Sequence, residues 1–156
     1  MRVSFIYAST AGHTEYVATD LSDRLREAGA DVTLTRAERA GPTELAAGDI
    51  LLLACGTWNT GGIEGQLNPH MQALLQGRGA GAELKGKPCL AIGLGDRRYR
   101  YTANAAVLLE QWCTTHGATM LLPALKIVDE PYDRLDEVLK PWLDQLLGKL
   151  RAFPIA

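Results

Sequence analysis

Hydroxyl-bearing residues and a glycine are concentrated in residues 9–14, which follow a short apolar run near the N-terminus. This segment, Ser-Thr-Ala-Gly-His-Thr, contains no lysine or arginine. Backbone N–H groups at the start of a helix, together with hydroxyl donors, can hold a phosphate dianion without a side-chain cation. The same residue types also favour an ordinary helix cap, so the segment alone leaves phosphate binding and simple capping as alternatives.

Two further segments combine small residues with aromatic rings. Trp58 lies in residues 56–64, among Gly, Thr and Asn neighbours that offer its ring little apolar cover. Residues 93–101 begin Gly-Leu-Gly-Asp and continue with Arg97, Arg98, Tyr99, Arg100 and Tyr101. Such rings can pack against an aromatic ligand. Taken alone, residues 56–64 fit a tryptophan folded onto the core as well as they fit a ligand site. Taken alone, residues 93–101 favour an arginine-rich turn in solvent.

The elements that must position these segments follow from hydrophobic patterning, because short apolar runs alternate with longer amphipathic ones. Strands are predicted at residues 3–7, 32–35, 50–55 and 89–93, and a fifth strand, interrupted by Pro123, at 119–122 and 125–128. Helices are predicted at residues 14–28, 65–76, 103–116 and 132–150. This alternation predicts an α/β fold with a doubly wound, five-stranded parallel sheet and helices on both faces.

All three candidate segments directly follow predicted strands. In a doubly wound sheet, ligands bind beyond the carboxyl ends of the strands, where the strand order reverses. We therefore expect the three segments to meet at one edge of the sheet. A phosphate site and two aromatic faces at one edge are typical of a site for a mononucleotide that carries a large planar ring.

These segments resemble the flavin-binding loops of the short-chain flavodoxins, and the resemblance covers essentially the whole chain. Its motifs are the phosphate-loop segment 9–14, the pair Thr57-Trp58 with Ile63-Glu64, the pattern Gly93-x-Gly95-Asp96-x-x-Tyr99-x-Tyr101, and Leu125-Lys126-Ile127 before Asp129. The resemblance implies a flavodoxin-like sheet of order 2-1-3-4-5, FMN as the cofactor, and one-electron transfer between redox protein partners.

The resemblance also implies which residues bind FMN. They are Ser9, Thr10, Ala11, Gly12, His13, Thr14, Thr57, Trp58, Asn59, Thr60, Gly61, Leu94, Gly95, Asp96, Tyr99 and Tyr101. Trp58 and Tyr99 are expected to enclose the isoalloxazine ring, with Asp96 beside its pyrimidine edge. No residue is expected to be catalytic or to bind a metal.

The chain departs from the family pattern at three places. Ala11 stands where a threonine is usual, which removes one phosphate donor, and Asn59 stands where glycine is common. Arg97, Arg98 and Arg100 occupy a loop that is typically acidic. We expect these arginines to raise the potential of the second one-electron step and to favour a partner with an acidic docking surface.

Two other function classes remain open at this point. One is an FMN-dependent reductase of quinones or similar small acceptors, although little chain remains to cover a substrate pocket. The other is a flavodoxin-like module that is redox-silent or serves one partner enzyme, which the fold alone permits. The run from Gly81 to Lys87 imitates a phosphate-binding P-loop, but Pro88 stands in place of the metal-binding Ser or Thr, so we reject it.

Composition supports a globular chain. With 156 residues, 47 % of them hydrophobic and 22 % charged, we expect one domain over residues 1–156. The net charge of −2 argues against nucleic acid as a partner, and the short apolar runs argue against a membrane. The three cysteines lack C-x-x-C spacing, so we expect reduced thiols and a cytoplasmic location. With no long apolar seam evident, we expect a monomer.

Overall fold

The computed structural model describes residues 1–60, 63–97 and 102–152. Within this part of the chain, a seven-stranded sheet follows the order β2-β1-β3-β5-β6. β1 (Arg2–Ala8) lies between β2 (Asp31–Arg36) and β3 (Ile50–Thr60), and β3 pairs with β5 (Pro88–Gly95). β6 (Thr119–Met120) and β7 (Leu125–Val128) both pair with β5. All of these pairs are parallel.

The predicted sheet is confirmed in its direction and order, since the predicted fourth strand is β5 and the predicted fifth strand is β6 followed by β7. The interruption at Pro123 is also present. Pairing with β5 stops after the Leu121 N–H, which donates to the Cys89 carbonyl at 3.0 Å, and it resumes where Leu125 lies opposite Ile92. Proline has no N–H to offer to a strand ladder, which accounts for the gap.

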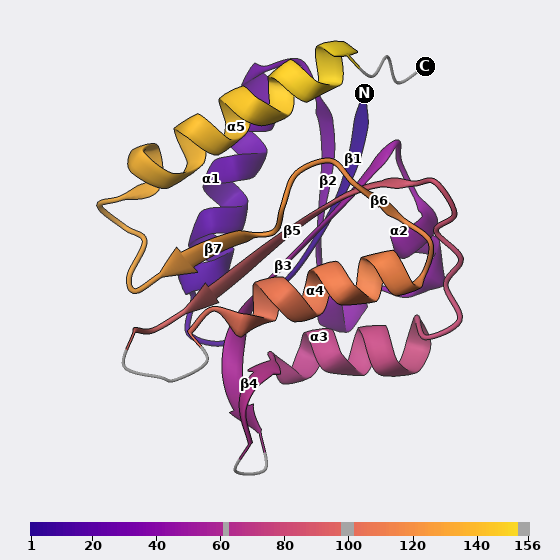
Figure 1. Ribbon diagram of the computed structural model, residues 1–156, viewed down its shortest axis with the longest axis vertical. Coiled ribbons are helices and arrows are strands. Elements are labelled where there is room, and N and C mark those ends of the chain that lie inside the picture. Colours follow the sequence, from indigo (N-terminus) through magenta and orange to yellow (C-terminus); the bar gives the residue numbers. More distant parts are fainter. Residues whose placement is uncertain (61–62, 98–101, 153–156) are drawn as a thin grey trace.

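Helices cover both faces of the sheet, as Figure 1 shows. α1 (His13–Glu27) and α5 (Leu135–Ala152) pack on one face, whereas α2 (Pro42–Ala46), α3 (Pro69–Ala73) and α4 (Asn104–Thr115) pack on the other. Successive strand residues point to opposite faces. Phe5 therefore joins the core under α1 and α5, while its neighbour Ile6 joins the core under α3 and α4.

The predicted helices at residues 14–28, 103–116 and 132–150 correspond to α1, α4 and α5 within a few residues. α5 continues through Pro141 as one helix. The sequence patterning did not predict α2 or the short 3₁₀ turn η1 (Ala37–Arg39). Both are too short to show a helical period of apolar residues.

The predicted helix at residues 65–76 is wrong in its first part. There, β4 (Ile63–Leu67) runs antiparallel to the end of β3, and the two strands form a hairpin that projects from the sheet in Figure 1. α3 begins only at Pro69 because Asn68 caps it, with Oδ1 accepting the His70 N–H at 2.9 Å. Proline suits the first helical position because no N–H is needed there. A π-helical turn, η2 (Leu74–Arg78), follows α3.

Candidate cofactor site

A cavity of about 540 Å³ lies at the carboxyl edge of the sheet. This volume falls within the range of about 300–1,000 Å³ that is usual for small-molecule and cofactor sites. The turn after β1, the end of β3 and the loop after β5 all contribute to its wall, so the three candidate segments meet as predicted. The predicted residues that line it are Ser9, Thr10, Ala11, His13, Thr14, Thr57, Trp58, Leu94, Gly95 and Asp96.

The remaining predicted residues are placed as follows. Gly12 lies inside the β1–α1 turn, and Asn59 lines an adjoining cavity of about 310 Å³ that shares Trp58 and Asp96 with the first. Thr60 is the last residue of β3. Gly61, Tyr99 and Tyr101 lie outside the residues that the structure describes.

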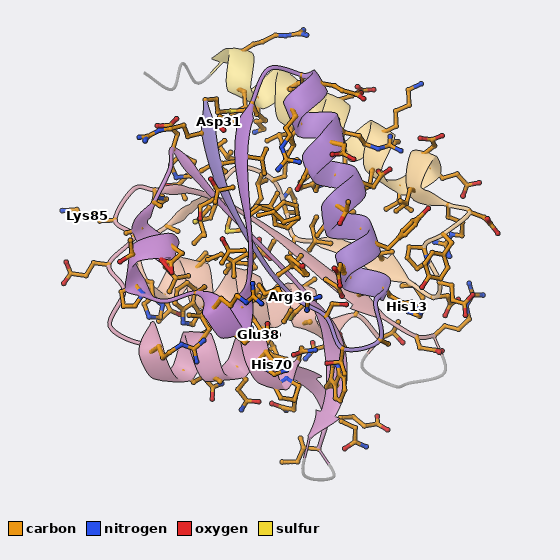
Figure 2. The ribbon with its side chains drawn as sticks, turned by 180° about the vertical axis from the view of Figure 1, so that it is seen from behind. His13, Asp31, Arg36, Glu38, His70 and Lys85 are labelled. Atoms are coloured by element: carbon orange, nitrogen blue, oxygen red, sulfur yellow. The ribbon has the colours of Figure 1, made fainter. Side chains whose placement is uncertain are left out.

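The β1–α1 turn leaves the start of α1 open to a ligand. Gly12 is the N-cap residue and adopts φ 92°, a left-handed conformation that glycine tolerates without steric cost. Its own N–H donates to Ser9 Oγ at 3.1 Å, and among the described residues no side chain caps the first helical turn. Figure 2 shows His13 at this end of α1. Unpaired N–H groups and the positive end of the helix dipole make this turn suitable for a phosphate.

Asn68 is a site residue that the sequence analysis missed. Only 1 % of it is exposed, and it lines the cavity. Its Nδ2 donates to Thr10 Oγ1 at 3.1 Å, while its Oδ1 caps α3 through His70. One buried amide therefore joins the β1–α1 turn to the segment that follows β4. The Asn-Pro pair was a visible helix-start signal, but nothing local indicated contact with Thr10.

Residues 56–60 and 63–64 are strand rather than the loop that was predicted, because β3 continues to Thr60 and β4 begins at Ile63. The strand register shifts between Trp58 and Thr60, so Asn59 lies at an irregularity in the pairing of β3 with β4. Trp58 is half-buried and lines both cavities. The hairpin thus carries an aromatic ring at the cavity wall, next to a residue outside the regular ladder.

The hydroxyl of Thr57 has a structural partner. Thr57 Oγ1 accepts the Ala105 N–H at 3.0 Å and so satisfies a donor at the start of α4. This bond fixes the end of β3 against α4, beneath Trp58. The Thr57 O–H itself remains able to donate to a ligand in the cavity that Thr57 lines.

The glycine at position 95 permits close packing between the end of β5 and the segment that leads into α4. A Cβ added at Gly95 would meet the Ala103 nitrogen at 2.1 Å, a distance that no side chain can occupy. Thr102 Oγ1 donates to the Asp96 carbonyl at 3.0 Å. These contacts hold Leu94, Gly95 and Asp96 at the cavity wall.

Arg97, the first arginine of the predicted arginine-rich loop, has an acidic partner at the cavity. Its guanidinium forms an ion pair with the Asp129 carboxylate, and its backbone N–H donates to Asp129 Oδ1 at 2.9 Å. The backbone hydrogen bond and the guanidinium hold the pKa of that carboxyl below its usual value. Arg98 and Arg100 lie outside the described residues.

The site fits a flavin mononucleotide in two respects. The uncapped start of α1 and the hydroxyls around it suit a phosphate monoester, and Trp58 offers a ring face on the same cavity. In the described part of the chain, no group of three or more His, Cys, Asp or Glu side chains is placed to hold a metal ion. The fold and the cavity define a doubly wound α/β protein with a mononucleotide site at its switch point.

Comparisons with known proteins agree with this description. The family model described as flavodoxin matches residues 5–142. The flavodoxin of Nitratidesulfovibrio vulgaris (strain Miyazaki F) is 33 % identical over 150 residues, covering 95 % of this chain and 98 % of that protein. Protein MioC of Escherichia coli K12 is also 33 % identical over 150 residues, covering 92 % of this chain and 97 % of that protein. The crystal structure of oxidised Flavodoxin 2 from Bacillus cereus superposes with a TM-score of 0.84 at 26 % identity, covering 95 % of this chain and 98 % of that one.

The chain belongs to the flavodoxin family. Its cofactor is FMN, and its function is that of an electron carrier between redox proteins. The reductase alternative is not favoured by these relatives. Of the helices in the described part of the chain, none combines the length and apolar character that a bilayer crossing requires.

Proposed function

We propose that the 540 Å³ cavity holds one FMN and that the chain passes single electrons between redox proteins through it. The observation that carries this assignment is the convergence of three chain segments on one cavity, each with a different part of the required chemistry. Bound FMN supplies the one-electron chemistry, and the protein supplies binding, orientation and electrostatic environment.

The β1–α1 turn is proposed as the phosphate site. The first N–H groups of α1 point along the helix axis toward the cavity end, and the hydroxyls of Ser9, Thr10 and Thr14 add donors. Gly12 lets the chain turn into α1 without a side chain in the way. Ala11 contributes only its backbone, so this turn has one hydroxyl fewer than the family pattern.

The ring of the cofactor is proposed to lie between Trp58 and Tyr99. Trp58 supports this from the cavity wall, and Tyr99 follows Gly95 and Asp96, which line the same cavity. Asp96 is assigned to the pyrimidine edge of the ring. The remaining predicted residues, Asn59, Thr60, Gly61, Leu94 and Tyr101, complete the proposed set through the hairpin tip and the loop after β5.

We further propose that the chain is a cytoplasmic monomer whose partners present an acidic docking surface. Its three cysteines are free and buried, which suits a reducing compartment. Arg98 and Arg100 flank Tyr99 in sequence, so a positive loop would border the exposed edge of the ring. Sedimentation equilibrium at micromolar concentration tests the oligomeric state, with a single species of the chain mass expected.

The experiment that tests the assignment is identification of the chromophore. We expect the purified chain to be yellow, and we expect acid release followed by chromatography to yield FMN in a one-to-one ratio with the chain. Stepwise reduction should then consume two separate one-electron equivalents. A chain that purifies colourless and stays colourless after incubation with excess FMN would contradict the proposal.

A further inference from the structure

Asp129 links two segments at the cavity that are 32 residues apart in the sequence. It follows β7 directly, and its backbone N–H donates to the Gly95 carbonyl at 2.7 Å. Its carboxylate accepts the Arg97 N–H at 2.9 Å and also pairs with the Arg97 guanidinium. Asp129 therefore binds the residue before Asp96 through its main chain and the residue after Asp96 through its side chain. Asp129 also lines the cavity.

The backbone of Asp129 is held in an unusual conformation. Its φ of 66° lies in the left-handed region, which is unfavourable for residues other than glycine, though Asp and Asn tolerate it best. Such a conformation persists where the surrounding structure determines it strongly, and it is often found at functional sites. The preceding carbonyl, that of Val128, is also fixed, because Arg134 Nη1 donates to it at 2.8 Å.

We propose that Asp129 is a positioning residue that orders residues 95–97 before FMN binds. This inference rests on the proposed function, because it takes the 540 Å³ cavity as the FMN site. A loop that is already ordered loses less conformational entropy when its ligand binds. We assign most of the effect to the bond with the Arg97 N–H, because the Arg97 side chain is 74 % exposed and an exposed ion pair contributes little.

Two substitutions at position 129 separate the carboxylate from the backbone conformation. Asp129→Gly removes the side chain but suits a positive φ, so the fold itself keeps its turn. Asp129→Asn keeps an oxygen that can accept the Arg97 N–H while it removes the charge. Asp133→Asn is the matched control, because it removes a carboxylate from the same connection to α5 at an exposed position.

Two quantities are measured for each variant. One is the dissociation constant for FMN, from flavin fluorescence quenching. The other is the amide hydrogen-exchange rate of residues 95–97 in the FMN-free protein, which reports local opening without any ligand. In Asp129→Gly we expect both to rise about tenfold or more, as loss of a charge-assisted bond implies. Asp129→Asn should recover most of each change, and Asp133→Asn should match the parent in both.

Three results would overturn the proposal. Unchanged exchange in Asp129→Gly would mean that the loop is ordered without the carboxylate. Faster exchange with unchanged FMN affinity would mean that loop order does not matter for binding. Weaker binding with unchanged exchange would assign Asp129 a direct contact with FMN instead. A parent protein that binds no FMN would overturn the proposed function, and this inference with it, whatever the exchange rates are.

Discussion

At the scale of single residues, Trp58 is the side chain that we propose stacks on the flavin ring. It lies half-buried at the wall of both cavities, where a flavin ring can cover it. Stacking of an aromatic side chain on a base contributes about 1–3 kcal/mol, and we apply that scale to the flavin. The other two tryptophans, Trp112 and Trp142, pack in the helical layers.

Replacing Trp58 with alanine should therefore raise the dissociation constant for FMN roughly tenfold or more. Trp58→Phe should keep most of the affinity because it retains an aromatic face. The control is Trp112→Phe, since Trp112 donates from Nε1 to the Leu75 carbonyl at 3.0 Å and lies away from both cavities. Titration followed by flavin fluorescence measures all three. Parent-like binding by Trp58→Ala would show that the ring is not a stacking partner.

The cysteines allow a second test at this scale. Burial raises the pKa of the Cys55 thiol to about 12. A side-chain hydrogen bond with Cys89, together with burial, raises the pKa of the Cys113 thiol. Because the thiolate is the reactive form, we expect no thiol to react with a disulfide reagent in the native protein at pH 8. All three should react after unfolding in guanidinium. Rapid modification of the native protein would show that the core opens at the cysteines.

At the scale of elements, the pairing of β3 with β4 is irregular directly after Trp58. The flavodoxin resemblance implies that the peptide after Trp58 would turn its carbonyl toward the ring of bound FMN. Asn59 stands at this position, where the pairing register of β3 with β4 shifts. Glycine would make the required positive φ easier than asparagine does.

We therefore expect Asn59→Gly to raise the potential of the first one-electron step by about 40 mV, which corresponds to roughly 1 kcal/mol of relieved backbone strain. The yield of half-reduced protein during photoreduction should increase accordingly. Asn59→Ala should move the potential the other way. A decrease, or no change, with Asn59→Gly would separate position 59 from the redox chemistry.

Asn68 connects the phosphate turn to α3, so its two functions can be tested apart. Asn68→Ala loses the helix cap and should reduce the free energy of unfolding by about 1 kcal/mol, measured with urea on the FMN-free protein. Asn68→Asp keeps an acceptor for the His70 N–H but places a negative charge beside Thr10. Because position 68 is buried, this charge should also lower the free energy of unfolding, and the variant should bind FMN at least tenfold more weakly than the parent. Equal FMN affinity in Asn68→Asp and the parent would remove Asn68 from the proposed site.

The elements that the sequence revealed are those with a strong local pattern. The buried strands and the three long helices carry enough apolar residues to show their period. β4 does not, because only its pairing with β3 makes residues 63–67 a strand. The sequence likewise placed Asp129 only after the last strand. Its contact with Arg97 was not predicted, because Arg97 lies 32 residues away in the sequence. Local sequence predicts elements and single loops, whereas contacts between two loops depend on the finished fold.

At the scale of the whole molecule, we propose that the charge around the cofactor site determines which partners approach quickly. The net charge is only −2, so local charges rather than the overall field should steer association. Arg97 is balanced by Asp129, which leaves Arg98 and Arg100 as the arginines proposed to attract an acidic partner.

Small acceptors of opposite charge test this proposal without a named partner. Oxidation of the fully reduced protein by ferricyanide should slow as salt rises, because screening weakens its attraction to the positive loop. The double variant Arg98→Gln/Arg100→Gln should lose most of this salt dependence. Oxidation of the parent by hexaammineruthenium(III), a cationic acceptor, should not become slower as salt rises. If the two oxidation rates depend on salt in the same way, the charges of Arg98 and Arg100 do not steer the acceptors.

The central claim, that the start of α1 holds the phosphate of FMN, is tested most directly by comparing the affinities of FMN and riboflavin. The two ligands share the ring and the ribityl chain and differ only in the phosphate. Two charge-assisted hydrogen bonds from the turn would stabilise FMN by about 3 kcal/mol or more, so FMN should bind at least roughly a hundredfold more tightly. Equal dissociation constants for the two ligands would contradict the account, because the β1–α1 turn would then contribute nothing to cofactor binding.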